Sequence, residues 1–283
     1  MRQAARAACL ALAVAATTSA QEQGNQPADP FRIAGNLYYV GSSDLGSYLV
    51  ATEAGHILID AGYPSTVPII EANVARLGFK IADVKILLNT QGHADHAGGF
   101  AALKQRTGAT LMVSAADADL IERGGTRDFS LGDSLTFPSA KVDRRLKDGD
   151  TVSIGGMTLT ARLTPGHTMG CTTWTFGVED AGRTLHVVDV CGLSILEKTR
   201  VSGMPGYPNI TQDYLRTFAT LKKLPVDIFI GAHANYYGGM EKAAARQANP
   251  NGPNPFIDPA GYRKYIEDVE KRFNEQLKRE RSR

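Results

Sequence analysis

The sequence predicts an α/β fold in which helices cover β-sheets. Short runs rich in Val, Ile, Leu and Tyr, separated by turns that contain glycine, are typical of strands and appear early in the chain. Strand-like and helix-like patterns then alternate, and the middle of the chain returns to strands before a final helix. Because no linker rich in Pro, Ser or Gly interrupts this mixture, we expect one domain of sheets covered by helices.

The individual elements follow from the same patterns, and no repeat of fixed period is present. Strands are expected at residues 36–40, 47–51, 56–60, 84–89, 110–114, 151–154, 157–163, 172–176, 185–189 and 226–230. Helices are expected at residues 66–77, 99–106, 116–123, 212–222 and 259–277, and a loop at 249–255. The basic stretch 263–283 is interpreted as an amphipathic surface helix.

The first twenty residues are expected to be a secretory signal peptide. Arg2 and Arg6 precede an apolar run over residues 7–16, which ends in small residues before position 20. No later run reaches the roughly 20 apolar residues that a membrane span requires. We therefore expect a mature domain over residues 21–283, exported to the periplasm.

The charge pattern argues against a nucleic-acid partner. The formal net charge is +2, and lysine and arginine are scattered along the chain instead of clustered. The expected partner is a small molecule, and we expect a monomer.

Three apolar strands each lead directly into a loop that carries histidine. Loops beyond strand ends at one edge of a sheet converge on a common cleft, so four of the six histidines would meet there. The polar side chains of these loops are Gln91, His93, Asp95, His96, His167 and His233.

Imidazole and carboxylate groups in this number are a ligand set for zinc, which keeps an open position for water when it is catalytic. A single histidine at a strand end is more often a surface or hydrogen-bonded residue, but four in three such contexts favour a metal site. Small residues at 92, 94 and 97–99 leave room for the metal and let the backbone turn sharply.

The histidine motifs resemble those of a known family. The strings His93-Ala94-Asp95-His96, Pro165-Gly166-His167-Thr168 and Gly231-Ala232-His233 resemble the metal-binding signature of the metallo-β-lactamase superfamily. More narrowly, residues 36–41, 57–60, 170–174 and 202–205 are similar to the class B, subclass 3 β-lactamases. This resemblance covers nearly the whole mature chain and implies an αββα sandwich with the site at one edge of its two sheets.

The resemblance also implies two zinc positions. One zinc would be held by the residue at position 91 with His93 and His167, and the other by Asp95, His96 and His233. The family pattern begins with histidine, whereas this chain has Gln91, and an amide oxygen is a weaker zinc ligand than imidazole. A glutamine variant of the subclass exists, so the change is compatible with activity. It leaves open whether one or two zinc ions are tightly bound.

The expected mechanism follows from the metal. Bound zinc lowers the pKa of its water from about 15.7 toward 7 and polarises the carbonyl under attack. In this scheme Asp95 binds zinc and orients the attacking water, which makes it the expected catalytic residue.

Two cysteines and an aspartate near these loops leave alternatives open. In an oxidising compartment Cys171 and Cys191 are interpreted first as a disulfide, with zinc ligation by Cys191 as the alternative. Asp189 is interpreted as a turn-capping residue in preference to a bridging metal ligand of the kind found in thioesterases of this fold. We expect His56 and His186 to pack or form hydrogen bonds, and Trp174 to lie in the core.

The leading functional hypothesis is a β-lactamase that hydrolyses penicillins, cephalosporins and carbapenems, and so confers antibiotic resistance. The first alternative is an exported hydrolase with another substrate, such as a thioesterase of the glyoxalase II type. The second is a zinc-binding protein without catalysis, in which Gln91 would mark the loss of activity. The loops 194–207 and 234–255 are expected to form the walls of the cleft.

Overall fold

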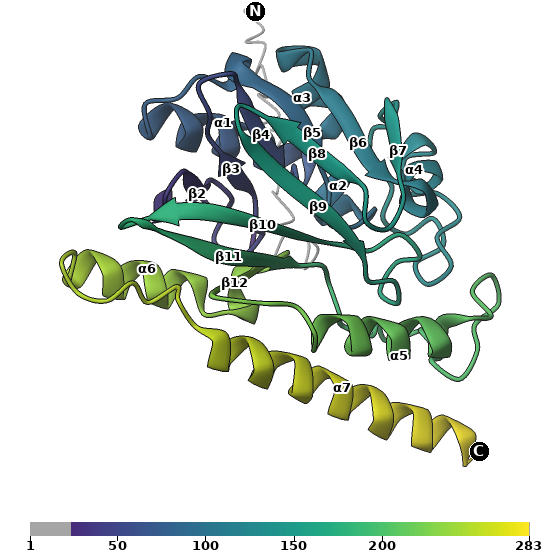
Figure 1. The fold of residues 1–283 in the computed structure, drawn as a ribbon. Helices are drawn as coiled ribbons and strands as arrows, with labels where there is room; N and C mark the ends of the chain where they lie inside the picture. The colour runs from purple at the N-terminus through teal and green to yellow at the C-terminus, as the bar shows by residue number, and fades with distance from the viewer. Residues whose placement is uncertain (1–23, 283) are drawn as a thin grey trace, which may run out of the picture.

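Two β-sheets face each other in the computed structural model, and helices cover the outer face of each (Figure 1). The structure describes residues 24–282. The expected signal peptide, residues 1–20, lies outside the described residues. The four layers form the αββα sandwich that the sequence analysis anticipated.

The first sheet has seven strands in the order of the chain, β1-β2-β3-β4-β5-β6-β7. Side chains of its strands alternate between its two faces, and both faces are covered. Tyr48 and Val50 of β3 point into the core between the sheets, whereas Leu49 points toward the outer helices. The strands are β1 (Phe31–Ala34), β2 (Leu37–Tyr39), β3 (Tyr48–Val50), β4 (His56–Ile59), β5 (Val84–Leu88), β6 (Thr110–Ser114) and β7 (Arg144–Leu146).

The second sheet has five strands in the order β12-β11-β10-β9-β8. Only the β11–β12 pair is parallel, so β12 ends at the same edge of the sheet as β11. The strands are β8 (Thr151–Ile154), β9 (Met157–Leu163), β10 (Thr172–Asp180), β11 (Arg183–Val190) and β12 (Ile228–Gly231).

The helices divide between the two outer layers (Figure 1). Buried apolar residues of α1, α3 and α4 pack with the outer face of the first sheet, and those of α5 and α7 belong to the core that includes the second. The helices are α1 (Val67–Arg76), α2 (Ala94–Ala97), α3 (Phe100–Thr107), α4 (Ala115–Glu122), α5 (Ile210–Leu221), α6 (Gly239–Ala248) and α7 (Pro259–Arg281). Three short 3-10 helices are η2 (Pro64–Thr66), η3 (Ile81–Asp83) and η4 (Ala234–Tyr236).

The predicted elements are present, and the unpredicted ones are two strands, two α-helices and short 3-10 helices. Strands β1 and β7 are four and three residues long, which is too short to give a periodic pattern. Helix α2 is a single turn within the predicted metal loop. The prediction of a loop over 234–255 was wrong, because it contains η4 and the ten-residue helix α6.

The residues assigned to packing lie where they were expected. Trp174 is completely buried between the sheets and donates its indole N–H to the carbonyl oxygen of Asn89 at 2.9 Å. His56 packs edge-on against Phe79, and His186 lies 3.1 Å from Asp227. Within residues 24–282, no helix is both long enough and apolar enough to cross a bilayer.

Cys171 and Cys191 form a disulfide between the loop before β10 and the end of β11, with a Cα–Cα distance of 5.8 Å. The preferred interpretation of the two cysteines is therefore confirmed. Zinc binds the thiolate form of cysteine, so Cys191 is not a zinc ligand while this bond is present.

Replacing both cysteines by alanine is expected to lower the free energy of unfolding by about 3 kcal/mol, because the disulfide closes a loop and restricts the unfolded chain. The two cysteines are 20 residues apart. Urea unfolding of the oxidised wild-type protein and the variant, both loaded with zinc, measures the difference. Loss of a zinc equivalent from a stably folded variant would contradict the purely structural role of the pair.

Candidate metal centre

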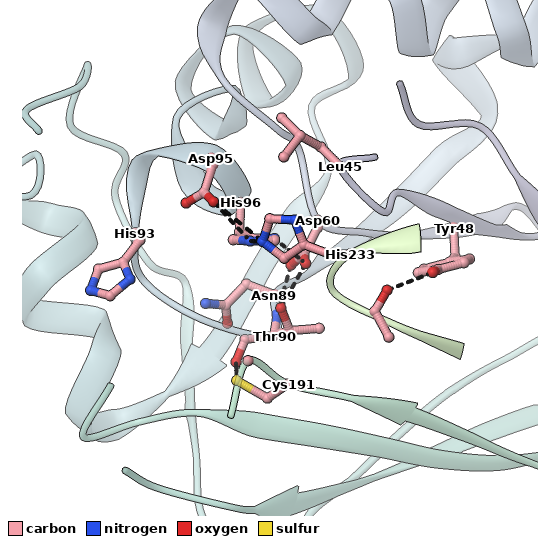
Figure 2. A network of polar contacts seen from close by, with 12 residues as sticks. Leu45, Tyr48, Asp60, Asn89, Thr90, His93, Asp95, His96, Cys191 and His233 are labelled. Carbon is pink, nitrogen blue, oxygen red and sulfur yellow. Dashed lines mark hydrogen bonds and ion pairs between the residues drawn. The ribbon is translucent and has the colours of Figure 1, made fainter. Parts of the chain in front are cut away.

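Asp95, His96 and His233 form a compact cluster of side chains that could hold a metal ion (Figure 2). One ligand atom from each lies within 4.8 Å of the others. Asp95 Oδ2 lies 3.3 Å from His96 Nε2 and 3.5 Å from His233 Nε2, and the two Nε2 atoms are 3.3 Å apart. Two imidazole nitrogens and a carboxylate oxygen that converge in this way are the donor types that zinc takes in catalytic sites. We call these three residues the second group, because they are the residues predicted for the second of the two zinc positions.

The cluster is assembled from two parts of the chain, the single turn of α2 and the residues after β12. His93 precedes the first residue of α2, so Asp95 and His96 lie on its single turn. His233 comes from the other sheet, two residues after β12 ends, and its backbone forms a bridge with Leu45. Gly98 closes the turn of α2 where a Cβ would collide with the carbonyl oxygen of Ala94, so this position requires glycine.

Carboxylates behind the second group fix the orientation of both imidazoles. His96 Nδ1 lies 3.0 Å from Asp60 Oδ2, and His233 Nδ1 lies 3.0 Å from Asp44 Oδ2. A proton on each Nδ1 can be donated to these carboxylates, which leaves Nε2 as the coordinating atom. This arrangement is the carboxylate–histidine pair that commonly supports a zinc ligand.

The charges of the second group favour a cation. Burial alone would raise the pKa of Asp95, but His96 and His233 hold that pKa well below its ordinary value. Burial alone would lower the pKa of His96, but Asp95 and Asp60 together raise it to about 10. Binding of a metal ion therefore requires release of a proton from His96, so the metal affinity falls as the pH is lowered.

Gln91, His93 and His167 form a neighbouring set, which we call the first group. His93 Nδ1 lies 3.1 Å from His167 Nε2. A Cβ added at Gly192 would come within 2.8 Å of Gln91 Nε2 and 2.9 Å of His167 Cδ2, which places Gln91 beside His167. The structure thus brings together all three residues that the sequence analysis assigned to the weaker position.

The polar atoms of the first group fit a metal ion. Gln91 is 1% exposed, and its Oε1 is buried without a hydrogen-bond partner in the described part of the chain. A buried acceptor without a donor is costly, and a cation would satisfy it. His167 Nδ1 lies 2.7 Å from the carbonyl oxygen of Ser194, to which it can donate, so the unprotonated nitrogen is Nε2, which faces His93. Burial lowers the pKa of His167 to about 3. A neutral imidazole is the form that binds metal.

Asp189 corrects one prediction. It lies within β11 and not in a turn. Neither of its carboxylate oxygens has a hydrogen-bond partner within residues 24–282, so the turn-cap interpretation was wrong. Its side chain is completely buried, and this burial raises its pKa well above the ordinary value. It is also absent from the cluster of Asp95, His96 and His233.

Sequence reasoning missed the carboxylates that support the histidines. Asp44, Asp60 and Asp128 face His233, His96 and His93 respectively; the last pair is 3.5 Å apart. The sequence offered one signal for Asp60, which is its position at the end of an apolar strand. In the structure, its φ of 58° also marks an unusual backbone conformation. Asp44 had none, because it lies 189 residues from its partner.

Comparison with known proteins places this geometry in a family. Residues 47–233 match the metallo-beta-lactamase superfamily. The native FEZ-1 metallo-beta-lactamase from Legionella gormanii is 41% identical, with a TM-score of 0.89 over 92% of this chain and 99% of that chain. BJP-1, a subclass B3 metallo-beta-lactamase of Bradyrhizobium japonicum, is 38% identical, with a TM-score of 0.86 over 93% of this chain and 99% of that chain.

A more distant similarity reaches another group of hydrolases. The hydroxyacylglutathione hydrolase of Rhodopseudomonas palustris (strain BisB18) is 30% identical over 221 residues, which cover 76% of this chain and 68% of that protein. Two other curated relatives match over a shorter region. The aligned segment spans 34% of the length of one of these relatives and 35% of the length of the other.

Proposed function

This chain belongs to the metallo-β-lactamase superfamily and is a hydrolase of the metallo-β-lactamase type. We propose that it is a zinc-dependent β-lactamase. The proposed reaction is hydrolysis of the β-lactam amide of penicillins, cephalosporins and carbapenems, which would confer antibiotic resistance. The observation that carries the proposal is the pair of adjacent donor groups at one edge of the two sheets.

The two groups divide the binding of zinc between them. We assign one zinc position to Asp95, His96 and His233, and the other to Gln91, His93 and His167. Zinc, when bound, supplies a Lewis acid for the amide carbonyl and lowers the pKa of a coordinated water from about 15.7 to about 7. The second group contains the only carboxylate of the six residues, so we expect it to be the tighter position.

Asp95 is the proposed catalytic residue. Its side chain is 23% exposed, whereas that of His96 is fully buried, so the Asp95 carboxylate faces the open side of the cluster. One oxygen contacts the two imidazoles, and the other is available to accept a hydrogen bond from the attacking water. The low pKa of Asp95 keeps it ionised and able to accept that bond at neutral pH.

A thioesterase is the second candidate function, favoured by the similarity to hydroxyacylglutathione hydrolases. A bridging Asp189 would favour this alternative, but Asp189 is not part of the second group. We further propose export to the periplasm by residues 1–20 and a monomeric state, which suit an enzyme that meets antibiotics outside the inner membrane.

Hydrolysis of a chromogenic cephalosporin and of a carbapenem by the purified mature protein tests the proposal. We expect turnover that a zinc chelator abolishes and added zinc restores, because every assigned ligand serves the metal. A thioester of glutathione serves as the comparison substrate. Absence of β-lactam turnover in zinc-loaded protein, with hydrolysis of the thioester, would replace the β-lactamase proposal with the thioesterase.

A further inference from the structure

Asp117, in the first turn of α4, is buried beneath the metal-binding loops and accepts three hydrogen bonds from them. It is 1% exposed. The backbone N–H of Gly92 donates to its Oδ2 at 2.8 Å, and the hydroxyl of Thr168 donates to the same oxygen at 2.7 Å. The backbone N–H of Gly170 donates to Oδ1 at 2.8 Å. One carboxylate therefore joins two loops that are far apart in sequence.

These two loops carry the whole first group. Gly92 lies between Gln91 and His93, and Thr168 directly follows His167. The 3.1 Å approach of His93 to His167 therefore depends on how the two loops are held relative to each other. Asp117 contacts both loops within one residue of these side chains.

Close packing shows that this contact is built into the backbone. A Cβ at position 170 would overlap Ser114 Oγ and the backbone nitrogen of Asp117, and one at position 92 would lie 3.3 Å from Asp117 Cγ. Ser114, which caps α4, also donates its hydroxyl to the carbonyl oxygen of Gly170 at 2.6 Å. Both loops thus have glycine where they meet the start of α4.

We propose that Asp117 is a positioning residue that holds the loop of Gln91 and His93 against the loop of His167, and so preorganises the first metal position. This role matters more in this chain than in one with three imidazoles, because Gln91 supplies a weak amide ligand. With a weaker ligand, more of the affinity depends on donors that are already in place before the metal binds.

A carboxylate suits this role and an amide does not. All three partners are donors, and an ionised carboxylate offers only acceptors. Burial raises the pKa of Asp117, and the hydrogen bonds from Thr168, Gly170 and Gly92 oppose that rise. In Asp117→Asn the NH2 group would face either the N–H of Gly170 or the N–H of Gly92, so one of these backbone donors would lose its acceptor at almost unchanged side-chain volume.

The second group has separate support, which makes the effect selective. His96 and His233 are oriented by Asp60 and Asp44, and neither carboxylate touches Asp117 in the hydrogen bonds of the described residues. Loss of the Asp117 contacts should therefore weaken one metal position and leave the other intact.

Zinc titration of the metal-free full-length mature protein tests this inference. Competition with a chromophoric chelator yields a dissociation constant for each position, and metal analysis after dialysis yields the stoichiometry. We expect Asp117→Asn to weaken the first position by about 10–100-fold, the usual effect of losing a group that supports a ligand. The dissociation constant of the second position should stay unchanged.

Asp119→Asn is the matched control, because it makes the same change two residues along α4 at an exposed ion pair with Arg145. Thr168→Val removes a single donor to Asp117 and should weaken the same position to a smaller extent, which keeps the test valid if Asp117→Asn folds poorly. The inference would be overturned if zinc binding weakened equally at both positions, or if it weakened at neither. A wild-type protein that binds a single zinc would overturn it as well.

The inference rests on the proposed zinc enzyme but fails separately from it. If the wild-type protein binds two zinc ions with the selective response to Asp117→Asn and hydrolyses no β-lactam, the proposed substrate is wrong and the positioning role stands. If it hydrolyses β-lactams and Asp117→Asn leaves both zinc affinities unchanged, the substrate stands and the positioning role is wrong.

Discussion

Replacing Asp95 with asparagine is expected to lower kcat for β-lactams by about 10²–10⁴-fold, the range for loss of a group that handles a proton in the transition state. Asparagine keeps the shape of the side chain, so the packing around His96 and His233 is preserved. It removes the only negative charge among the six proposed ligands and replaces one carboxylate oxygen with an NH2 group, which cannot accept a hydrogen bond from the attacking water. The change should also weaken zinc binding at the second position.

Measurements at saturating zinc separate these two effects of Asp95→Asn. Metal content and kcat are determined on the same sample, so that a slow enzyme with its zinc in place can be recognised. Asp83→Asn, at an exposed carboxylate in η3, is the control and should match the wild-type protein. A fully loaded Asp95→Asn enzyme that retains kcat within about threefold would show that Asp95 is not the catalytic residue.

The sequence predicted the layers of this fold because its longer elements carry strong periodic patterns. Strands such as β5 and β9 and helix α7 occur where apolar residues repeat at the strand or helix period. The elements that were missed have no such signal: β1 and β7 are short, and α6 has one buried residue, Gly239. Helix α6 forms from alanine-rich sequence of high helical propensity and meets the core through the partly buried Met240 and Ala243.

The proximity of the proposed metal ligands could be predicted because each follows a recognisable strand, and strand ends share an edge of a sheet. The residues that orient them could not. Asp44 and His233 are 189 residues apart, and no local pattern records that they meet. The disulfide remained an open question for the same reason, since the distance between Cys171 and Cys191 depends on the register of β10 and β11. Asp189 was misassigned because its position at a predicted strand end suggested a turn.

Replacing Gln91 with histidine is expected to strengthen zinc binding at the first position by at least about tenfold, equivalent to ~1.4 kcal/mol. The Gln91 Oε1 atom is buried and has no hydrogen-bond donor among the described residues, so it can accept a cation. Imidazole supplies a stronger donor at the same point, next to His167 and His93. Zinc stoichiometry at limiting free zinc should therefore rise toward two ions per chain.

Turnover decides whether the first position contributes to catalysis. If its occupancy limits the wild-type enzyme, Gln91→His should raise kcat/KM at limiting zinc and lose that advantage at saturating zinc. Gln105→His, on the exposed side of α3, controls for an added surface imidazole. A rise in zinc stoichiometry without any change in turnover would show that position 91 does not limit the reaction. Catalysis would then depend on the second group, in which Asp95 supplies both a ligand and the acceptor for the attacking water.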